Sequence, residues 1–188
     1  MRLFPAPVAG ILTLLVWVSL TGGLHLDGLA DCCDGLLASA SVERRLEIMK
    51  DPRLGAFGGI GLILVLLLKA ASLATFTPAT SFGIILAASL ARWCILPAGL
   101  MPLARPSGLG ADFAAGFRRW YIFVGAIFPL GLALALGTRG VISLLAGLVA
   151  AALVLWLAKS RINGVTGDVF GLVVEVVETV SLLAFVVK

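Results

Sequence analysis

Charged residues are scarce in this sequence of 188 residues, since Asp, Glu, Lys and Arg together make up only 13% of it. A soluble domain carries about a quarter of its residues as charges, because water must solvate its surface. Apolar residues account for 61% of the chain, and its mean hydropathy is +1.13. The shortage of charge therefore excludes an ordinary soluble domain and makes the lipid bilayer the main solvent.

Polybasic runs and paired cysteines are also missing. The net charge is +4, but long apolar stretches separate the basic residues, so no nucleic-acid partner is expected. The three cysteines, Cys32, Cys33 and Cys94, show no CxxC spacing, and His25 is the only histidine. This pattern argues against a disulfide framework and against a zinc site. We interpret Cys32 and Cys33 as small packing residues in a reducing compartment.

Six apolar runs approach the length of about 20 residues that a helix needs to cross a bilayer. We predict spanning helices near residues 5–24, 56–76, 81–100, 120–137, 141–158 and 168–187. The first run begins with Pro5 and Pro7 and is long for a signal peptide, so we treat it as a retained span. The predicted fold class is an all-α polytopic membrane protein with one membrane-embedded domain, residues 1–188.

Basic residues are concentrated in alternate connections between these runs. Nine of the 14 lie in residues 25–55, 101–119 and 159–167. The opposite side has only Arg2, Arg139 and Lys188. Because loops rich in Lys and Arg stay in the cytoplasm, we expect the three segments to share the cytoplasmic face and the N-terminus to lie outside.

Six of the ten acids fall between Asp27 and Asp51, and three of them form a stripe. A helix over this region would place Asp27, Asp31 and Asp34 within about 60° of one another. Like charges at this spacing destabilise a helix unless a cation neutralises them. Carboxylate oxygens suit Mg²⁺, with Mn²⁺ as an alternative, and such a site leaves positions open for phosphate. We therefore predict a metal-binding helix at the membrane interface.

Gly28 and Gly35 lie seven residues apart on the next face of this helix, where a bulky ligand or a second helix could approach the backbone. Glycine in a helix costs about 1 kcal/mol, so a reason for both is expected. The alternative is a solvated acidic helix paired with Arg44 and Arg45. That alternative explains the charges but neither the stripe nor the glycines.

A basic loop follows the acidic motif within residues 25–55. Pro52 is expected to end a helix near Lys50, which would let Asp51 fold back as a fourth metal ligand. Lys50, Arg53 and the backbone N–H groups of the turn at residues 55–58 could then bind phosphate. A plain interfacial loop is the alternative.

These residues carry a family resemblance. Residues 20–35 read Leu-Thr-Gly-Gly-Leu-His-Leu-Asp-Gly-Leu-Ala-Asp-x-x-Asp-Gly, and residues 44–58 read Arg-Arg-Leu-Glu-Ile-Met-Lys-Asp-x-Arg-x-Gly-x-Phe-Gly. Later motifs follow in order: Arg92-Trp93, Ala104-Arg105-Pro106 with Gly108-Leu109-Gly110, and Thr166-Gly167-Asp168 with Gly171, Glu175 and Glu178. From about Leu14 onward the chain resembles cobalamin synthase, the adenosylcobinamide-GDP ribazoletransferase family.

The resemblance implies a multi-pass enzyme of the inner membrane, similar in layout to the CDP-alcohol phosphotransferases, with its active site on the cytoplasmic face. It implies that a hydroxyl of α-ribazole or its 5′-phosphate attacks adenosylcobinamide-GDP, so that GMP leaves and adenosylcobalamin or its 5′-phosphate forms, with a divalent metal required. Family members usually begin with a further helix and loop, which we expect this chain to lack. Cys32-Cys33 stands where the family more often has small or hydroxyl residues.

The candidate site residues fall into three groups. Asp27, Asp31 and Asp34 are expected to be catalytic metal ligands, with Asp51 as a weaker fourth. Lys50, Arg53 and Arg105, together with Gly28 and Gly35, are expected to contact substrate. His25 is a candidate base or hydrogen-bond donor; its alternative is a polar residue at a helix end.

Four charged residues fall inside predicted spans: Lys69, Arg92, Glu175 and Glu178. They are expected to form ion pairs or to line the path of the acceptor together with Asp168 and Gly171. Two other functions remain open, an ion-coupled transporter and a phospholipid synthase of the CDP-alcohol type. No internal repeat supports the transporter. The sequence leaves the oligomeric state, including a homo-oligomer, undecided.

Overall fold

The computed structural model describes residues 3–187, so the expected placement of Arg2 and Lys188 lies outside the described residues. The described chain is helical and contains no β-strand. Its helices are α1 (Ala6–Thr21), α2 (Leu24–Leu37), α3 (Val42–Ile48), α4 (Ala56–Thr75), α5 (Phe82–Ala98), α6 (Leu109–Gly116), α7 (Trp120–Ala135), α8 (Gly137–Ile162) and α9 (Gly167–Val186). The all-α membrane class predicted from composition is confirmed.

Six of these helices, α1, α4, α5, α7, α8 and α9, lie where the apolar runs predicted spans. Helices α4, α8 and α9 are each long and apolar enough to cross a membrane alone. If each of the bent pairs α1–α2 and α6–α7 counts as one span, the described residues contain five candidate spans. This count is below the six expected, because α5 has only 17 residues.

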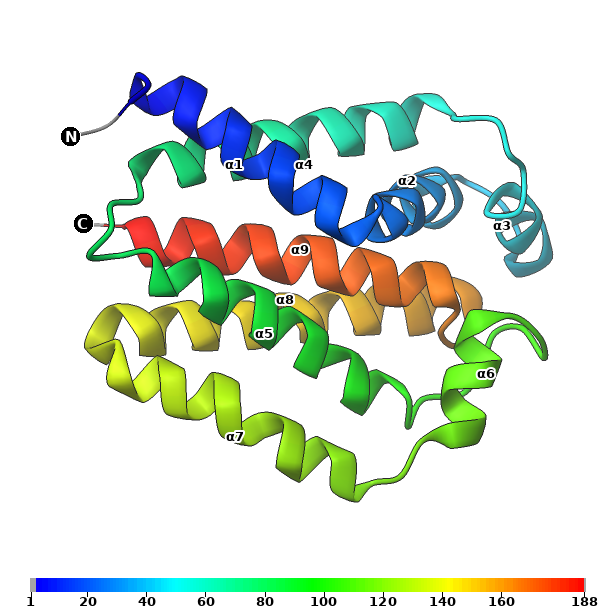
Figure 1. The fold of residues 1–188 in the computed structure, drawn as a ribbon. Helices are drawn as coiled ribbons and strands as arrows, with labels where there is room; N and C mark the ends of the chain where they lie inside the picture. The colour runs from blue at the N-terminus through cyan, green and yellow to red at the C-terminus, as the bar shows by residue number, and fades with distance from the viewer. Residues whose placement is uncertain (1–2, 188) are drawn as a thin grey trace.

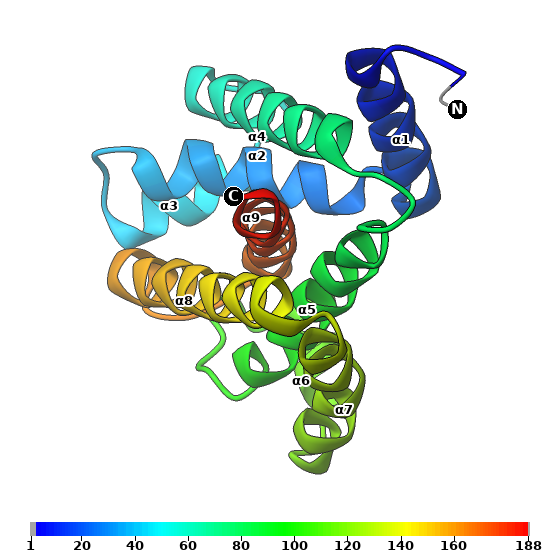
Figure 2. The ribbon, with the colours of Figure 1, turned by 90° about the vertical axis from the view of Figure 1, so that its left-hand side faces the viewer.

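Helix α2 lies across the bundle instead of continuing α1. Gly22 and Gly23 adopt left-handed φ angles of 61° and 69°, which glycine tolerates without steric cost, and the chain turns by 93° between the two helices. Figure 2 shows α2 crossing the line of α9, which is seen end-on. The acidic helix is therefore positioned over one end of the spanning helices.

The two ends of the bundle differ in what they contain. Helices α2, α3 and α6 and the α8–α9 connection lie at one end, whereas the α4–α5 and α7–α8 connections lie at the other (Figure 1). The charged segments 25–55, 101–119 and 159–167 thus share one end, as the placement of basic residues predicts. The candidate site residues belong to this end.

Helix α9 is the centre of the fold and packs against α8, α2, α5 and α4 (Figure 2). Small residues permit the close approach of α8, where Ser143 Oγ donates a hydrogen bond to the carbonyl oxygen of Ser181 at 2.8 Å. Gly147 in α8 lies against the Ser181 hydroxyl. Small and hydroxyl residues are the usual means by which helices associate in lipid.

The charged residues of the spans pair with one another inside the bundle. Lys69 Nζ lies 2.7 Å from Glu175 Oε2 and 2.5 Å from Glu178 Oε2, and Arg92 also pairs with Glu178. Lys69 additionally lies over the ring of Trp17 at 5.5 Å. The first of the two expectations for these residues, ion pairing, is confirmed. The ion pairs connect α4, α5 and α9.

The outer faces of the spanning helices remain apolar and exposed, which suits contact with lipid. These residues include Ile60, Leu64, Leu67, Phe123, Ile127, Leu134, Leu145, Val149 and Leu153.

Candidate active site

The acidic stripe lies on α2, where the start of α9 approaches it closely. A methyl group at Gly28 would lie 2.7 Å from the carbonyl oxygen of Asp168, and one at Gly171 would lie 3.1 Å from that of His25. Only residues without a side chain permit this crossing. The crossing brings Asp168, the second residue of α9, beside the stripe.

Asp31 is surrounded by other acids. Burial raises the pKa of its carboxyl to about 6, with further contributions from the charges of Asp27 and Asp168, while Arg105 acts in the opposite direction. Asp27, Asp31 and Asp168 therefore form a group of acids that the protein neutralises only in part. A partly buried carboxyl whose pKa is raised in this way is a candidate functional-site residue.

Asp34 has a different environment from Asp31, although both belong to the predicted stripe. Its Oδ2 atom accepts a hydrogen bond from Gly55 N at 2.8 Å, and its Oδ1 atom accepts one from Gly58 N at 2.9 Å. Asp34 thus caps the N-terminus of α4. The expectation that N–H groups of the turn at residues 55–58 are free to bind phosphate is wrong for these two glycines, because Asp34 already occupies them.

Asp51 turns toward Arg53 and not toward the stripe. Arg53 donates to the Asp51 carboxylate from its backbone N at 3.0 Å, from Nε at 2.9 Å and from Nη2 at 2.6 Å. These hydrogen bonds and the charge of Arg53 lower the pKa of Asp51 to about 2. Arg53 itself is 86% exposed, and Lys50 is exposed as well. Arg53 and Asp51 border a hollow beside Asp34.

The arginines after α2 do not pair with the stripe. Buried Arg45 donates to the carbonyl oxygens of Leu36 at 2.6 Å and Ala40 at 3.0 Å, so it caps the C-terminal end of α2. Arg44 pairs with Glu47 at 2.8 Å. The alternative in which Arg44 and Arg45 neutralise the acidic helix is therefore wrong.

Both glycines of α2 pack against other helices. Gly35 lies against Arg45 and Met49 of the α3 region, as Gly28 lies against α9. Both glycines are buried. Packing therefore accounts for them in this structure, and their contact with substrate stays a prediction.

Arg105 reaches the site from the loop between α5 and α6. Its Nη1 atom donates to Asp168 Oδ2 at 3.0 Å and its Nη2 atom to the carbonyl oxygen of Leu46 at 3.0 Å, while Nε is buried without a partner. Ala104 N donates a hydrogen bond to the carbonyl oxygen of Val165, and Val165 N donates one to that of Pro102, so the loop is held against the α8–α9 connection. Arg105 therefore joins the acid group from a loop outside α2 and α9.

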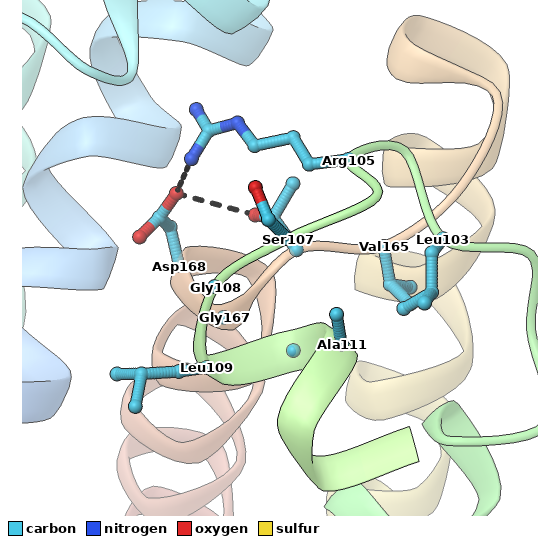
Figure 3. A pocket seen from close by; sticks show the side chains of 11 residues that line it. Leu103, Arg105, Ser107, Gly108, Leu109, Ala111, Val165, Gly167 and Asp168 are labelled. Carbon is cyan, nitrogen blue, oxygen red and sulfur yellow. Dashed lines mark hydrogen bonds and ion pairs between the residues drawn. The ribbon is translucent and has the colours of Figure 1, made fainter. Parts of the chain in front are cut away.

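A small pocket lies beside Arg105, between the starts of α6 and α9. Figure 3 shows the Arg105 guanidinium directed at Asp168, with Ser107 on the same loop. The lining residues are Leu103, Arg105, Ser107, Gly108, Leu109, Gly110, Ala111, Val165, Thr166, Gly167 and Asp168. Because helix N-termini and a guanidinium both favour negative charge, this pocket suits an anionic group.

A second cavity of about 300 Å³ lies on the other side of Asp168, between α2, α5, α6 and α9. His25 and Asp27 contribute to its wall, and Nδ1 of His25 is buried without a hydrogen-bond partner. Burial and the charges of Arg92 and Lys69 lower the pKa of His25, against the opposing effect of Glu178. The other lining residues are Leu24, Gly28, Ile95, Leu109, Phe113, Gly167, Asp168, Phe170 and Gly171.

The predicted set of four metal ligands is not assembled. Among the described residues, no three side chains of His, Cys, Asp or Glu form a group that could hold a metal ion. Asp34 and Asp51 have the other partners described above. Asp27 and Asp31 remain, and Mg²⁺ often binds through one or two carboxylates completed by substrate phosphates. The donors therefore fit Mg²⁺ with a smaller ligand set, and metal binding stays a prediction.

Asp168 is more central than the sequence indicated. Its neighbour Thr166 caps α9, since Thr166 Oγ1 accepts a hydrogen bond from Val169 N at 3.3 Å. A Thr followed by an acid in the first turn is a helix-start signal. That signal predicts where α9 starts, but it does not predict that this start lies beside α2. The aromatic lining residues Phe113 and Phe170 have no sequence signal of their own.

Three curated relatives are each named adenosylcobinamide-GDP ribazoletransferase. They come from Pseudomonas paraeruginosa (39% identical over 186 residues), Escherichia coli K12 (38% over 188) and Pseudomonas aeruginosa (40% over 187). The alignments cover 95% to 96% of this chain and 75% of each relative. No solved structure matches the chain. The family model described as cobalamin-5-phosphate synthase matches residues 1–186, and the chain therefore belongs to the cobalamin-5-phosphate synthase family.

Proposed function

We propose that the protein is an adenosylcobinamide-GDP ribazoletransferase. It transfers the adenosylcobinamide phosphate of adenosylcobinamide-GDP to α-ribazole or α-ribazole 5′-phosphate, with GMP as the leaving group and adenosylcobalamin or its 5′-phosphate as product. The observation that carries this proposal is the identity of 38% to 40% with relatives of that name over nearly the whole chain. The transporter and the phospholipid synthase have no comparable support.

The reaction is a displacement at phosphorus. A hydroxyl oxygen of the acceptor forms a bond to the phosphorus next to cobinamide, the bond from that phosphorus to the bridging oxygen of GMP breaks, and the hydroxyl proton passes to a base. We assign the role of base to His25, which lines the same cavity as Asp27. Such a reaction asks the protein mainly for alignment and charge neutralisation.

We assign the binding of a divalent metal to Asp27 and Asp31. When bound, Mg²⁺ or Mn²⁺ would supply positive charge to the phosphoryl oxygens of the donor. Removing metal with EDTA should abolish GMP release, and added Mg²⁺ should restore it. Activity that persists after exhaustive chelation would remove the metal from the proposal.

Arg105 and the basic loop hold the phosphates in this proposal. Arg105 lies beside the acid group, whereas exposed Arg53 lies in the loop before α4. Arg53→Ala should therefore raise the KM for adenosylcobinamide-GDP, and Asp31→Asn should raise the metal concentration needed for half-maximal rate. If Arg53→Ala shifts the metal requirement as strongly as Asp31→Asn, Arg53 positions carboxylates instead.

Purified protein in detergent or nanodiscs tests the function directly. GMP release from adenosylcobinamide-GDP should require added α-ribazole or its phosphate, and the cobalamin product should appear in equal amount. The proposal would be contradicted if GMP were released at the same rate without the acceptor, or if neither acceptor reacted.

The apolar helices place the chain in a membrane, and we propose the cytoplasmic membrane with the active site on the cytoplasmic face. The support is the shared end of the basic segments and the site residues (Figure 1).

A further inference from the structure

The lining of the cavity between α2, α5, α6 and α9 combines two kinds of chemistry. His25, Asp27 and Asp168 supply polar groups, and the other side chains of the lining are apolar. The volume of about 300 Å³ lies at the lower limit for small-molecule sites. A ligand that matches this lining must itself have one polar and one apolar part.

The apolar part of the lining includes two aromatic rings. Phe113 of α6 and Phe170 of α9 meet edge to face, with centroids 5.3 Å apart and planes at 65°. Ile95 of α5 completes this part of the wall. None of these three side chains can form an ordinary hydrogen bond, so a ligand with polar atoms on its ring edge would lose its water there without compensation. A flat ring with an apolar edge fits, because aromatic faces and edges stack on it.

The polar part of the lining comes from two helix starts. His25 and Asp27 belong to the first turn of α2, and Asp168 belongs to the first turn of α9. These groups accept hydrogen bonds from hydroxyls, which makes this part of the lining suitable for a sugar.

We propose that this cavity is the binding site of the acceptor nucleoside, with the apolar aromatic base against Phe113, Phe170 and Ile95 and the ribose toward His25 and Asp27. This proposal rests on the proposed function, in which the acceptor is a ribonucleoside of a benzimidazole. A glycosylated benzimidazole has an apolar outer edge. Guanine and adenine, the bases of the donor, have polar edges, and the corrin ring is far larger than the cavity.

Phe113→Ala tests the site, because it shortens one wall without touching the acid group. The KM for α-ribazole should rise about tenfold, whereas the KM for adenosylcobinamide-GDP should stay within about twofold. Phe117→Ala is the matched control: Phe117 stacks on Phe113 with centroids 5.7 Å apart but does not line the cavity. The control should leave both KM values unchanged.

A change in substrate specificity would distinguish loss of the cavity wall from loss of folding. The enlarged cavity of Phe113→Ala should shift the ratio of kcat/KM values toward nucleosides with bulkier substituents on the outer edge of the base. An unchanged preference with an unchanged KM for α-ribazole would overturn the proposal. So would a rise in the KM for adenosylcobinamide-GDP alone, which would assign the cavity to the donor.

Direct binding keeps this test independent of turnover. Calorimetric titration with α-ribazole should give a Kd about tenfold higher for Phe113→Ala than for the wild type and for Phe117→Ala. If the wild type binds α-ribazole in this way but transfers nothing, the proposed function fails and the binding site stands. If the wild type transfers and Phe113→Ala binds α-ribazole as tightly as the wild type, the site fails and the function stands.

Discussion

Asp31 and Asp34 lie on the same helix and belong to the same stripe, but their surroundings give them opposite effects on stability. Asp34 receives two backbone hydrogen bonds from the start of α4. Asp31 is partly buried among other acids, and the pKa of its carboxyl is raised to about 6. One carboxylate stabilises the fold, and the other is held at an energetic disadvantage that a bound cation would relieve.

Replacing Asp34 should therefore weaken the protein itself. Asp34→Ala removes two charge-assisted hydrogen bonds at a helix N-terminus, and the expected loss is about 2 kcal/mol of unfolding free energy. Thermal denaturation in detergent measures it. Asp112→Ala, an exposed acid in the first turn of α6, is the control and should change stability by less than about 0.5 kcal/mol. Full stability of Asp34→Ala would show that the cap is dispensable.

Asp31→Asn should have the opposite effect on stability, while it lowers turnover at a given metal concentration. The raised pKa means that ionised Asp31 destabilises the folded metal-free protein. This destabilisation is absent well below pH 3.8 and complete above about pH 6. The variant should therefore melt at a higher temperature than the wild type at pH 7, with EDTA present, and the difference should vanish near pH 3.8 and below. A variant that is less stable than the wild type at pH 7 would contradict this account.

At the scale of elements, the crossing of α2 over α9 assembles the site. The left-handed turn at Gly22 and Gly23 sends α2 across the bundle, and Gly28 and Gly171 let the two backbones meet. Asp27 and Asp31 come from one helix and Asp168 from the other. Their distance from one another depends on this crossing.

Gly28→Ala should separate the two helices, since the added methyl group would lie 2.7 Å from the carbonyl oxygen of Asp168. Misplacement of catalytic groups by about 1 Å can lower activity by about 100-fold, which is the expected fall in kcat/KM. Gly131→Ala in α7 is the matched control, because a methyl group there meets nothing within 4 Å. The control should keep full activity and gain slightly in stability. Equal activity of the two variants would show that the crossing tolerates a side chain.

At the scale of the whole molecule, the buried ion pairs connect spans that are far apart in sequence. Lys69 is 2% exposed and interacts with both Glu175 and Glu178, which belong to the central helix. A charge left without a partner in this interior is costly. The pairs therefore require α4, α5 and α9 to stay together.

Lys69→Met should destabilise the protein by about 3 kcal/mol or more, because two buried glutamates would then share Arg92. The double variant Lys69→Met/Glu175→Gln removes one of these charges and should recover part of the loss. Melting temperatures of the three proteins provide the comparison. If the double variant is less stable than Lys69→Met, the loss does not come from unpaired charge.

The arrangement of the bundle also predicts which residues are accessible from the same side of the membrane. Single cysteines introduced at Ser41 and Leu109 in a cysteine-free background should both react with an impermeant reagent from the cytoplasmic side, because both lie at the end that carries α2, α3 and α6. A cysteine at Ala79, in the α4–α5 connection, should react from the opposite side. Labelling of positions 41 and 109 from opposite sides would overturn the topology and the assembled site.

Local patterns were sufficient for the helices and for the acidic face. The apolar runs predicted the six principal helices to within a few residues, because a bilayer imposes length and composition directly on each segment. The spacing of Asp27, Asp31 and Asp34 predicted a shared face, because helical periodicity follows from the chain alone. The basic residues predicted which connections share an end.

Partners across the fold were decided only by the tertiary structure. Sequence spacing grouped Asp34 with Asp31, and the break at Pro52 suggested Asp51 as a weaker fourth ligand. In the structure, Asp34 instead caps the start of α4 and Asp51 pairs with Arg53. The same packing brings Asp168 to the acid group and closes an aromatic cavity beside it. The physical reason is that a side chain's role depends on which donors, charges and rings other helices bring near it, and periodicity within one helix contains no information about those neighbours.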